Sequence, residues 1–329
     1  MRHYLRPLLQ VGLARPADAL NFGACWFTHV EILSRGRAST VIPVSEMSGE
    51  ERARFGARTH YPTLMGILNT TPDSFSDGGQ HVSPEAAVEH GHALVTAGAG
   101  ILDIGGESTR PGASPVGVKE EIARTAPTIA ALRSGGLTAP ISIDTRKAAV
   151  AEAALDAGAT MVNDVSGFTY DADLAPLCAE RGVPVCVMHA QGDPQVMQKN
   201  PTYDDVLLDV YDFLAQRISD LTAQGIAREN IIADPGIGFG KTLDHNLALL
   251  TRISLFHALG VPILLGASRK RFIGTLGNAP QATARGPGSI GVALAALNQG
   301  VQIIRVHDVA DHAQAIALWR ASVAHRQDE

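Results

Sequence analysis

A repeated pattern of glycines and short apolar runs constrains the fold of this chain more than any other feature. An Ala- and Leu-rich stretch, a glycine and an apolar run with a polar end recur as AGAGILDIG, AGATMVND, RGVPVCVMH, LGVPILLGAS and QGVQIIRVHD. The glycines suit the left-handed position that ends a helix, and the runs suit strands buried on both faces. The pattern predicts alternating helices and parallel strands, with helix ends at Gly98, Gly158, Gly182, Gly260 and Gly300.

The number of apolar runs indicates how the sheet closes. Eight runs are predicted as strands: 64–69, 101–105, 141–144, 161–163, 185–189, 231–234, 263–266 and 303–307. Eight strands over about 250 residues are typical of a (β/α)8 TIM barrel, whereas a doubly wound open sheet more often has five or six. We therefore predict an α/β fold of the TIM-barrel type over residues 63–329, with helices at 204–224 and 242–259 and another that begins with Ser83 as N-cap.

Residues 1–62 lie outside this repeat and form a predicted N-terminal extension. The stretch ACWFTHVEIL within it is typical of a strand that caps one end of the barrel. The extension carries no recognisable chemistry.

Composition limits the classes of function. A chain of 329 residues that is 45% hydrophobic can bury a large core, and a net charge of −6 argues against a protein that coats nucleic acid. The three cysteines Cys25, Cys178 and Cys186 form no C-x-x-C pair, which favours reduced, buried thiols. With no apolar run near the roughly 20 residues of a membrane span, the sequence predicts a cytoplasmic protein with no membrane partner.

Every predicted strand delivers polar side chains at its carboxyl end, where a parallel barrel places its active site. Most of these residues are single polar side chains, but Arg305 lies inside an otherwise apolar strand. Two glycine-bearing loops, NTTPDSFSDGG and GGESTRPGAS, are long enough to act as lids. In chain order the strand ends supply Asn69, Asp103, Asp144, Asn163 with Asp164, Met188 with His189, Asp234, Ser268 to Lys270, and Arg305 with His307.

The strand-end residues fall into two chemical groups. Asp144, Asn163 and Asp234 suit a heterocycle with an amidine edge, and the cationic side chains suit an anion. The cationic group consists of Arg110, Lys270, Arg305 and His307. An amide oxygen of Asn69 suits Mg²⁺, which keeps most of its waters and takes few protein ligands. The pattern predicts a pocket for a planar polar ring with a phosphate tail.

Single motifs also allow simpler interpretations. DPGIGFGKT resembles a phosphate loop, but Pro235 stands where that motif needs glycine. Asp144 or Asp234, taken alone, fits equally well as a helix-capping acid. His189 and His307 form a possible metal pair, although no third ligand has a characteristic spacing.

Eight motifs together resemble one known family. In order they are MGILNTTPDSFSDGG, LDIGGESTRPGA, SIDT, VNDVSG, VMHAQG, DPGIGFGK, GASRK and RVHDV, between Leu64 and Val309. This series is similar to the dihydropteroate synthases, pterin-binding barrel enzymes of folate biosynthesis. The resemblance implies condensation of 6-hydroxymethyl-7,8-dihydropterin diphosphate with 4-aminobenzoate to give 7,8-dihydropteroate and diphosphate. It also implies that diphosphate leaves first and that the aromatic amine captures the resulting pterin cation.

The resemblance implies a role for each matching residue. Asn69 would bind Mg²⁺, the expected cofactor. The pterin would be held by Asp144, Asn163, Asp234 and Lys270, with Met188 and Phe239 lining its pocket. The diphosphate would contact Thr109, Arg305 and His307. The 4-aminobenzoate site would include Phe75, Arg110, Pro111 and Ser268, and Asp73 would steady the cation. Asp73, Arg110, Lys270, Arg305 and His307 are the expected catalytic residues.

The family resemblance also implies a homodimer and sulfonamides as mimics of 4-aminobenzoate. Two other functions were considered. A methyltetrahydrofolate-dependent methyltransferase shares the pterin-binding barrel but needs neither the cationic pair Arg305 and His307 nor the STRPG loop. A pterin-binding paralogue without turnover would keep the pocket but release no diphosphate.

Overall fold

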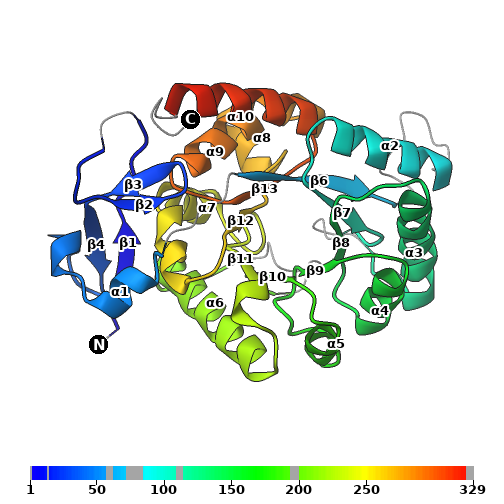
Figure 1. Cartoon of the computed structure of the whole chain (residues 1–329), viewed down its shortest axis with the longest axis horizontal. Helices are drawn as coiled ribbons and strands as arrows, with labels where there is room; N and C mark the ends of the chain where they lie inside the picture. Colours follow the sequence, from blue (N-terminus) through cyan, green and yellow to red (C-terminus); the bar gives the residue numbers. More distant parts are fainter. Residues whose placement is uncertain are drawn as a thin grey trace.

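The computed structural model describes residues 2–12, 15–56, 62–71, 84–108, 114–192 and 200–323. Eight parallel strands form one sheet that curls into a barrel, and helices surround it (Figure 1). The barrel strands are β6 (Thr63–Asn69), β7 (Ile101–Gly105), β8 (Ile141–Asp144), β9 (Met161–Asp164), β10 (Val185–Met188), β11 (Ile231–Asp234), β12 (Leu264–Leu265) and β13 (Ile303–Val306). The predicted TIM-barrel fold is confirmed.

The strand order follows the chain around the barrel, because each helix returns the chain to the next position in the sheet. The hydrogen-bonded order is β11-β10-β9-β8-β7-β6-β13-β12. A parallel bridge between Ala233 and Ile263 joins the two ends of this order. Ala233 N donates to Pro262 O at 2.9 Å at the same place, so the barrel closes between β11 and β12.

The helices alternate with the strands as predicted, and the predicted glycines lie at or near the ends of helices. All five predicted glycines have positive φ, and Gly182 and Gly260 end α5 and a 3-10 helix, η3, in the left-handed conformation. The helices are α2 (Pro84–Thr96), α3 (Val118–Ser134), α4 (Ala148–Asp156), α5 (Leu174–Arg181), α6 (Val206–Ala223), α7 (Leu243–Thr251), α8 (Arg271–Leu276), α9 (Gly286–Leu297) and α10 (Val309–Val323), with 3-10 turns η2 (Arg228–Asn230), η3 (Ile253–Leu259) and η4 (Ala282–Arg285). The predicted N-cap Ser83 lies outside the described residues.

Two predicted elements differ from the structure. The helix expected at 242–259 is interrupted at Arg252, whose φ of −130° ends α7 before η3 begins. The strand expected at 263–266 is reduced to Leu264–Leu265, because it pairs in regular register with β13 alone and meets β11 at a single bridge.

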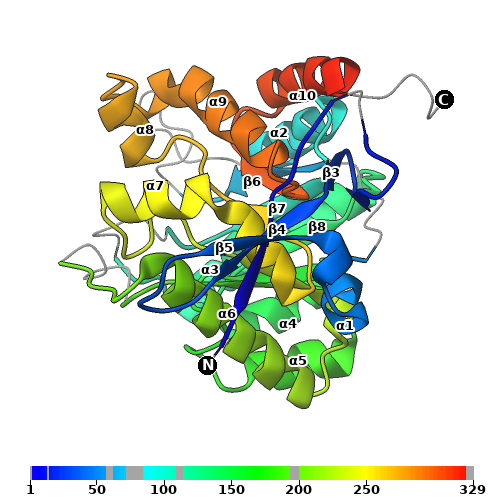
Figure 2. The same cartoon turned by 90° about the vertical axis from the view of Figure 1, so that its left-hand side faces the viewer.

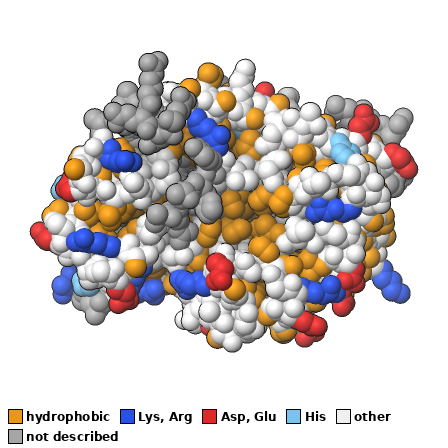
Figure 3. Space-filling view, in the orientation of Figure 1, with side chains coloured by type: hydrophobic (Ala, Val, Ile, Leu, Met, Phe, Trp, Pro, Cys, Tyr) orange, Lys and Arg blue, Asp and Glu red, His pale blue; other side chains and the backbone are white. Residues whose placement is uncertain are grey.

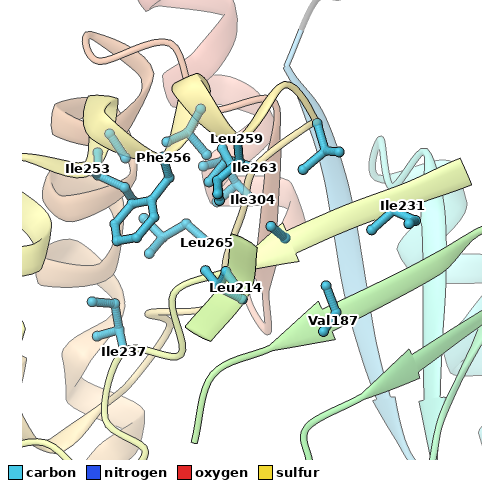
Figure 4. Close-up of a cluster of buried hydrophobic side chains, with 14 of the residues drawn as sticks. Val187, Leu214, Ile231, Ile237, Ile253, Phe256, Leu259, Ile263, Leu265 and Ile304 are labelled. Carbon is cyan, nitrogen blue, oxygen red and sulfur yellow. The ribbon is translucent and has the colours of Figure 1, made fainter. Parts of the chain in front are cut away.

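The core lies partly inside the barrel and partly between the strands and the helices. Figure 4 shows the second region, where Phe256 and Leu259 of η3 lie near Ile263 and Ile304. Inside the barrel a separate apolar layer consists of Met65, Met161, Cys186, Ile232, Leu264 and Ile303. Burial of this kind contributes about 25 cal/mol per Å² of apolar surface, so both regions stabilise the barrel.

The N-terminal extension forms two small antiparallel sheets of its own. One has the order β1-β4-β5, and the other is the hairpin β2-β3. Figure 2 shows these strands crossing the outside of the barrel beside η3. Tyr4 packs edge-on against Tyr211 of α6, and the Tyr4 hydroxyl donates to Asp212 at 2.8 Å. The elements are β1 (Tyr4–Pro7), β2 (Leu20–Phe22), β3 (Cys25–Phe27), β4 (His29–Leu33), β5 (Thr40–Pro43), η1 (Val44–Glu46) and α1 (Gly49–Ala53).

The surface and the cysteines agree with a globular chain. Among the described residues, no helix combines the length and apolar character that crossing a membrane requires. On the face shown in Figure 3, acidic and basic side chains are interspersed around a central group of hydrophobic ones. The three cysteines are free and buried, as the sequence predicted.

Candidate active site

The interior of the barrel changes from apolar to polar two residues further along the strands. Side chains two positions apart on a strand point to the same face, so the residues that follow the apolar layer also point inward. Ile101, Met161, Cys186, Ile232 and Ile303 belong to or pack against the apolar layer. The inward residues that follow them toward the carboxyl ends are Asp103, Asn163, Met188, Asp234 and Arg305.

An arginine held between two carboxylates lies at the centre of this polar layer. Arg305 Nε donates to Asp103 Oδ2 at 2.6 Å, and Arg305 Nη2 donates to Asp144 Oδ2 at 2.8 Å. Asn163 Nδ2 donates to Asp103 Oδ2 at 3.2 Å. We call these four residues the inner cluster. They come from β7, β8, β9 and β13, so only the closed barrel brings them together.

The inner cluster carries more negative than positive charge in a buried place. Asp103 is fully buried, whereas the Arg305 side chain remains 21% exposed. Burial, with the nearby Asp103 carboxylate, outweighs Arg305 and raises the pKa of Asp144 to about 7. Burial works against the charge of Arg305, but Asp103 and Asp144 outweigh it and raise the pKa of the guanidinium. The arginine therefore stays charged and keeps N–H groups for a ligand.

Asp103 had no role in the predicted site, although it was noted at a strand end. Asp103 lies in the run ILDIG, and this sequence does not show whether its carboxylate points into the barrel or toward solvent. A better signal is Arg305, since an inward-facing arginine in an apolar strand favours a carboxylate on a neighbouring inward position.

A second group of predicted residues gathers at the ends of β11 and β12. Asp234 Oδ1 accepts from Gly236 N at 2.7 Å, and Met188 is its partner in the register of β10 and β11. Lys270 Nζ lies 4.2 Å from the centre of the Phe239 ring and donates to Ile237 O. Burial raises the pKa of Asp234, although Lys270 opposes the shift. Burial lowers the pKa of Lys270 to about 7, against the effect of Asp234.

Ser268 and His307 are joined to each other at the edge of the site. Ser268 Oγ and His307 Nδ1 are 3.0 Å apart, and His307 N donates to the same hydroxyl at 3.2 Å. The next residues in each segment, Arg269 and Asp308, form an ion pair. The loop after β12 is thereby held beside the end of β13.

Asn69 lies beside the inner cluster at the end of β6. It pairs with Gly105, and a methyl group placed on Gly105 would lie 3.8 Å from Asn69 Oδ1 and 3.5 Å from Asp144 Cβ. Within the described ranges, no group of three or more His, Cys, Asp or Glu side chains is arranged to hold a metal. A single amide oxygen fits Mg²⁺, whose remaining ligands are usually water and substrate phosphate.

A second charged group lies on the other side of the β8 end. Lys147 Nζ donates to Glu121 Oε2 at 2.5 Å and to Glu107 Oε2 at 3.2 Å, and Thr145 Oγ1 donates to Glu121 Oε1 at 2.7 Å. Arg146 Nη2 reaches Glu107 at 3.3 Å. We call Glu107, Glu121, Thr145, Arg146 and Lys147 the outer network. It joins the end of β8 to α3 and to the segment after β7.

The helix-capping and metal-pair alternatives can be compared with the geometry. Asp144 binds Arg305, and Asp234 accepts from Gly236 N within its own turn. The N-caps of α4 and α7 are Lys147 and Thr242, so neither aspartate caps the helix that follows it.

Asp164 accepts from Ser166 N and Phe168 N, each at 2.7 Å, so its carboxylate fixes the turn after β9. His189 Nδ1 already contacts Lys241 Nζ at 2.9 Å, which argues against a metal pair with His307 through that nitrogen. The predicted site residues Asp73, Phe75, Thr109, Arg110 and Pro111 lie outside the described residues.

A closed parallel barrel with charged and amide side chains converging at the carboxyl ends of its strands defines an enzyme of the TIM-barrel class. The family model described as "Pterin binding enzyme" matches residues 65–307. Dihydropteroate synthase of Escherichia coli (strain K12) is 44% identical over 269 residues, which are 82% of this chain and 94% of that relative.

Solved structures give the same result. Xanthomonas albilineans dihydropteroate synthase with 4-aminobenzoic acid has a TM-score of 0.74 and 45% identity, over 79% of this chain and 92% of that one. Yersinia pestis dihydropteroate synthase in a sulfonamide drug complex has a TM-score of 0.75 and 40% identity, over 88% and 98% of the two chains. The chain belongs to the dihydropteroate synthase family.

Proposed function

We propose that the inner cluster and the adjoining ends of β11 and β12 form the active site of dihydropteroate synthesis. The reaction condenses 6-hydroxymethyl-7,8-dihydropterin diphosphate with 4-aminobenzoate, giving 7,8-dihydropteroate and diphosphate. The observation that carries the site assignment is Arg305, a cation braced by Asp103 and Asp144 at the open end of the barrel. A cation in this position suits the stabilisation of an anionic leaving group.

The pterin ring is held by acceptors and donors from four strand ends. Carboxylates of Asp144 and Asp234 suit the N–H groups of the amidine edge, and the Asn163 amide can both donate and accept. Lys270 and the Phe239 ring, 4.2 Å apart, suit the ring carbonyl and the ring face. Met188 supplies an apolar wall beside Asp234.

The diphosphate end is assigned to Arg305, His307 and Thr109, the last of which lies outside the described residues. Among the described residues, Asp103 and Asp144 each accept one N–H group of Arg305, and the other three of its five are assigned to phosphate oxygens. The C–O bond breaks first and its electron pair leaves with diphosphate. The amine nitrogen of 4-aminobenzoate then forms the C–N bond to the pterin carbon and loses one proton. Stabilising the departing charge is the main contribution of the protein.

Mg²⁺ is proposed as the cofactor, held by the amide oxygen of Asn69. Bound there, the ion would neutralise charge on the diphosphate as it departs. The fit rests on the position of Asn69 at the end of β6, next to Gly105 and close to Asp144. Asn69→Leu should reduce the Mg²⁺ dependence of diphosphate binding in calorimetry, and unchanged dependence would remove Asn69 from the metal site.

The second substrate site is assigned to Ser268 together with Phe75, Arg110 and Pro111, with Asp73 steadying the cation. Of these residues only Ser268 is described, and its hydroxyl contacts His307 from the diphosphate end. Sulfonamides should compete with 4-aminobenzoate at this place. Inhibition that is non-competitive with respect to 4-aminobenzoate would contradict the assignment.

A homodimer and a cytoplasmic location are also proposed. Leu276 of α8 and Leu318 of α10 are 59% and 69% exposed, which favours a partner surface on the late helices. Three buried free cysteines suit a reducing compartment. Sedimentation of the wild-type chain and of a Leu276→Glu/Leu318→Glu variant tests the dimer, since only the variant should be monomeric.

Diphosphate release tests the proposed function against its two rivals. The pterin diphosphate should yield diphosphate at a rate that depends on 4-aminobenzoate, with one dihydropteroate formed for each diphosphate. A methyltransferase or a non-catalytic pterin-binding protein would release none, and that result would overturn the function.

A further inference from the structure

The glycine-rich segment after β11 carries a buried lysine for which the proposed reaction has no role. Lys241 ends the stretch DPGIGFGK, and the residue is 3% exposed. In a phosphate loop the corresponding lysine points at phosphate. Here Lys241 Nζ instead contacts protein acceptors only, among the residues that the structure describes.

Three acceptors surround the amine. Lys241 Nζ lies 2.9 Å from His189 Nδ1, 3.3 Å from His189 O and 3.0 Å from Phe239 O. Three acceptors match the three N–H groups of an ammonium, with His189 neutral and its proton on Nε2. If the amine is neutral instead, it donates to the two carbonyls and accepts from His189 Nδ1–H. The three contacts therefore persist in either protonation state.

Two glycines allow the segment to lie directly on the loop after β10. A methyl group at Gly236 would lie 1.9 Å from His189 O, and one at Gly240 would lie 2.5 Å from Gln191 O. Both glycines have positive φ, of 68° and 60°, which other residues rarely adopt. The backbone thus approaches too closely for any side chain, and Lys241 joins the two loops at the same place.

Residues that the proposed function assigns to the pterin pocket flank this contact. Phe239, whose carbonyl accepts from Lys241, has its ring 4.2 Å from Lys270 Nζ. His189 directly follows Met188, and His189 N donates to Asp234 O at 3.0 Å. A shift of either loop would therefore move Phe239 and Met188 relative to Asp234.

We propose that Lys241 is a positioning residue for the pterin ring, which it serves by fixing the Phe239 loop against His189, and that it does not bind phosphate. This inference rests on the proposed pterin site. It assigns the buried lysine of the glycine-rich segment to the geometry of the ring pocket. The pocket walls come from two loops, and this amine contacts both.

The test compares Lys241→Met with Lys119→Met, a matched change at an exposed lysine of α3. Lys241→Met should weaken binding of the pterin alcohol and raise the KM for pterin diphosphate by about tenfold to a hundredfold. The KM for 4-aminobenzoate and the binding of inorganic diphosphate should change less than threefold. Lys119→Met should match the wild type in all four measurements.

Two results would overturn the proposal. Pterin affinity equal to wild type in folded Lys241→Met would make the lysine merely structural, and a selective loss of inorganic diphosphate binding would make it a phosphate ligand. Should Lys241→Met fail to fold, His189→Asn and His189→Leu test the same contact from the other side. Asn keeps an acceptor near Nδ1 and should retain most of the pterin affinity, while Leu should lose it, and equal affinities would overturn the proposal. If the wild-type chain itself binds no pterin, the proposed function fails instead.

Discussion

The inner cluster and the outer network both depend on the end of β8, yet they differ in charge balance and exposure. The inner cluster places two carboxylates around one guanidinium, and Arg305 and Asp144 keep 21% and 11% of their side chains exposed. The outer network balances two carboxylates with two cations, and the side chains of Glu121 and Lys147 are 0% and 8% exposed. Unbalanced, partly open charge is typical of functional sites, whereas removing one partner from balanced, closed charge is expected to destabilise the fold.

The largest effect should come from Arg305→Met in the inner cluster. Without its guanidinium, kcat/KM for the pterin diphosphate should fall by about a thousandfold, as when a main electrostatic stabiliser of a leaving group is lost. The free energy of unfolding should change less than the activity does. Asp144, whose pKa is about 7, can take up a proton and so avoid leaving an unpaired charge. Steady-state diphosphate release and thermal unfolding measure the two effects. If kcat/KM of Arg305→Met stayed within tenfold of wild type, the inner cluster would be no more functional than the outer network.

The opposite outcome is expected for Lys147→Met in the outer network. Glu121 and Glu107 lose their shared cation, which should lower the free energy of unfolding by about 3 kcal/mol. In the folded protein at low temperature, kcat/KM should stay within tenfold of wild type. Adding Glu121→Gln should restore part of the stability in urea unfolding. Unchanged stability with a thousandfold loss of activity would show that the outer network is catalytic.

The repeat predicted the barrel well because a parallel strand buried on both faces leaves a clear apolar run. The bounds of β7, β8 and β11 match the prediction to the residue. The short β12 and the break at Arg252 could not be predicted, since both depend on pairing and packing with distant segments.

Side-chain partners at the strand ends were harder to predict than the strands. Asp144 and Asp164 both end an apolar run, but one binds Arg305 and the other caps its own turn. Both strands end in an aspartate, so the sequence does not distinguish the two positions. Which carboxylate faces Arg305 depends on the arrangement of the strands in the closed barrel. Lys241 illustrates the same limit, because two of its three acceptors lie 52 residues away at His189.

The two clusters should also depend on pH in opposite directions. The pKa of Asp144 is about 7 in the folded state, above its unfolded value, so the folded protein binds the proton more tightly and stability falls as pH rises from about 4 to 7. For Glu107, burial is outweighed by Val116 N and Lys147, which lower its pKa, so its contribution is lost as pH falls below about 4.

Single substitutions separate these contributions. Wild-type stability should fall by about 3 kcal/mol between pH 4 and 7 because of Asp144, and Asp144→Asn should abolish that fall. Glu107→Gln should flatten the acid side of the curve. Chemical unfolding at a series of pH values provides the measurement. The same pH profile for both variants would contradict the proposed difference in charge balance.

The smallest effect should come from a charged pair that belongs to neither cluster. Arg35 joins the extension to Asp209 and Asp212 of α6, but its side chain is 41% exposed. Exposed pairs are worth about 0.2–1 kcal/mol, so Arg35→Ala should lower the unfolding free energy by no more than that and leave kcat/KM unchanged. A loss of more than about 2 kcal/mol in the unfolding free energy would show that an exposed charge can be as important for stability as a buried one in this protein.

Arg305, although paired with Asp103 and Asp144, is assigned to the diphosphate of the substrate. Calorimetric titration of wild type and Arg305→Met with pterin diphosphate and with the bare pterin alcohol tests this assignment most directly. The substitution should weaken the diphosphate ester at least about tenfold more than the alcohol, since only the ester carries the anion. Equal losses for both ligands would make Arg305 a structural partner of the two aspartates and contradict the account.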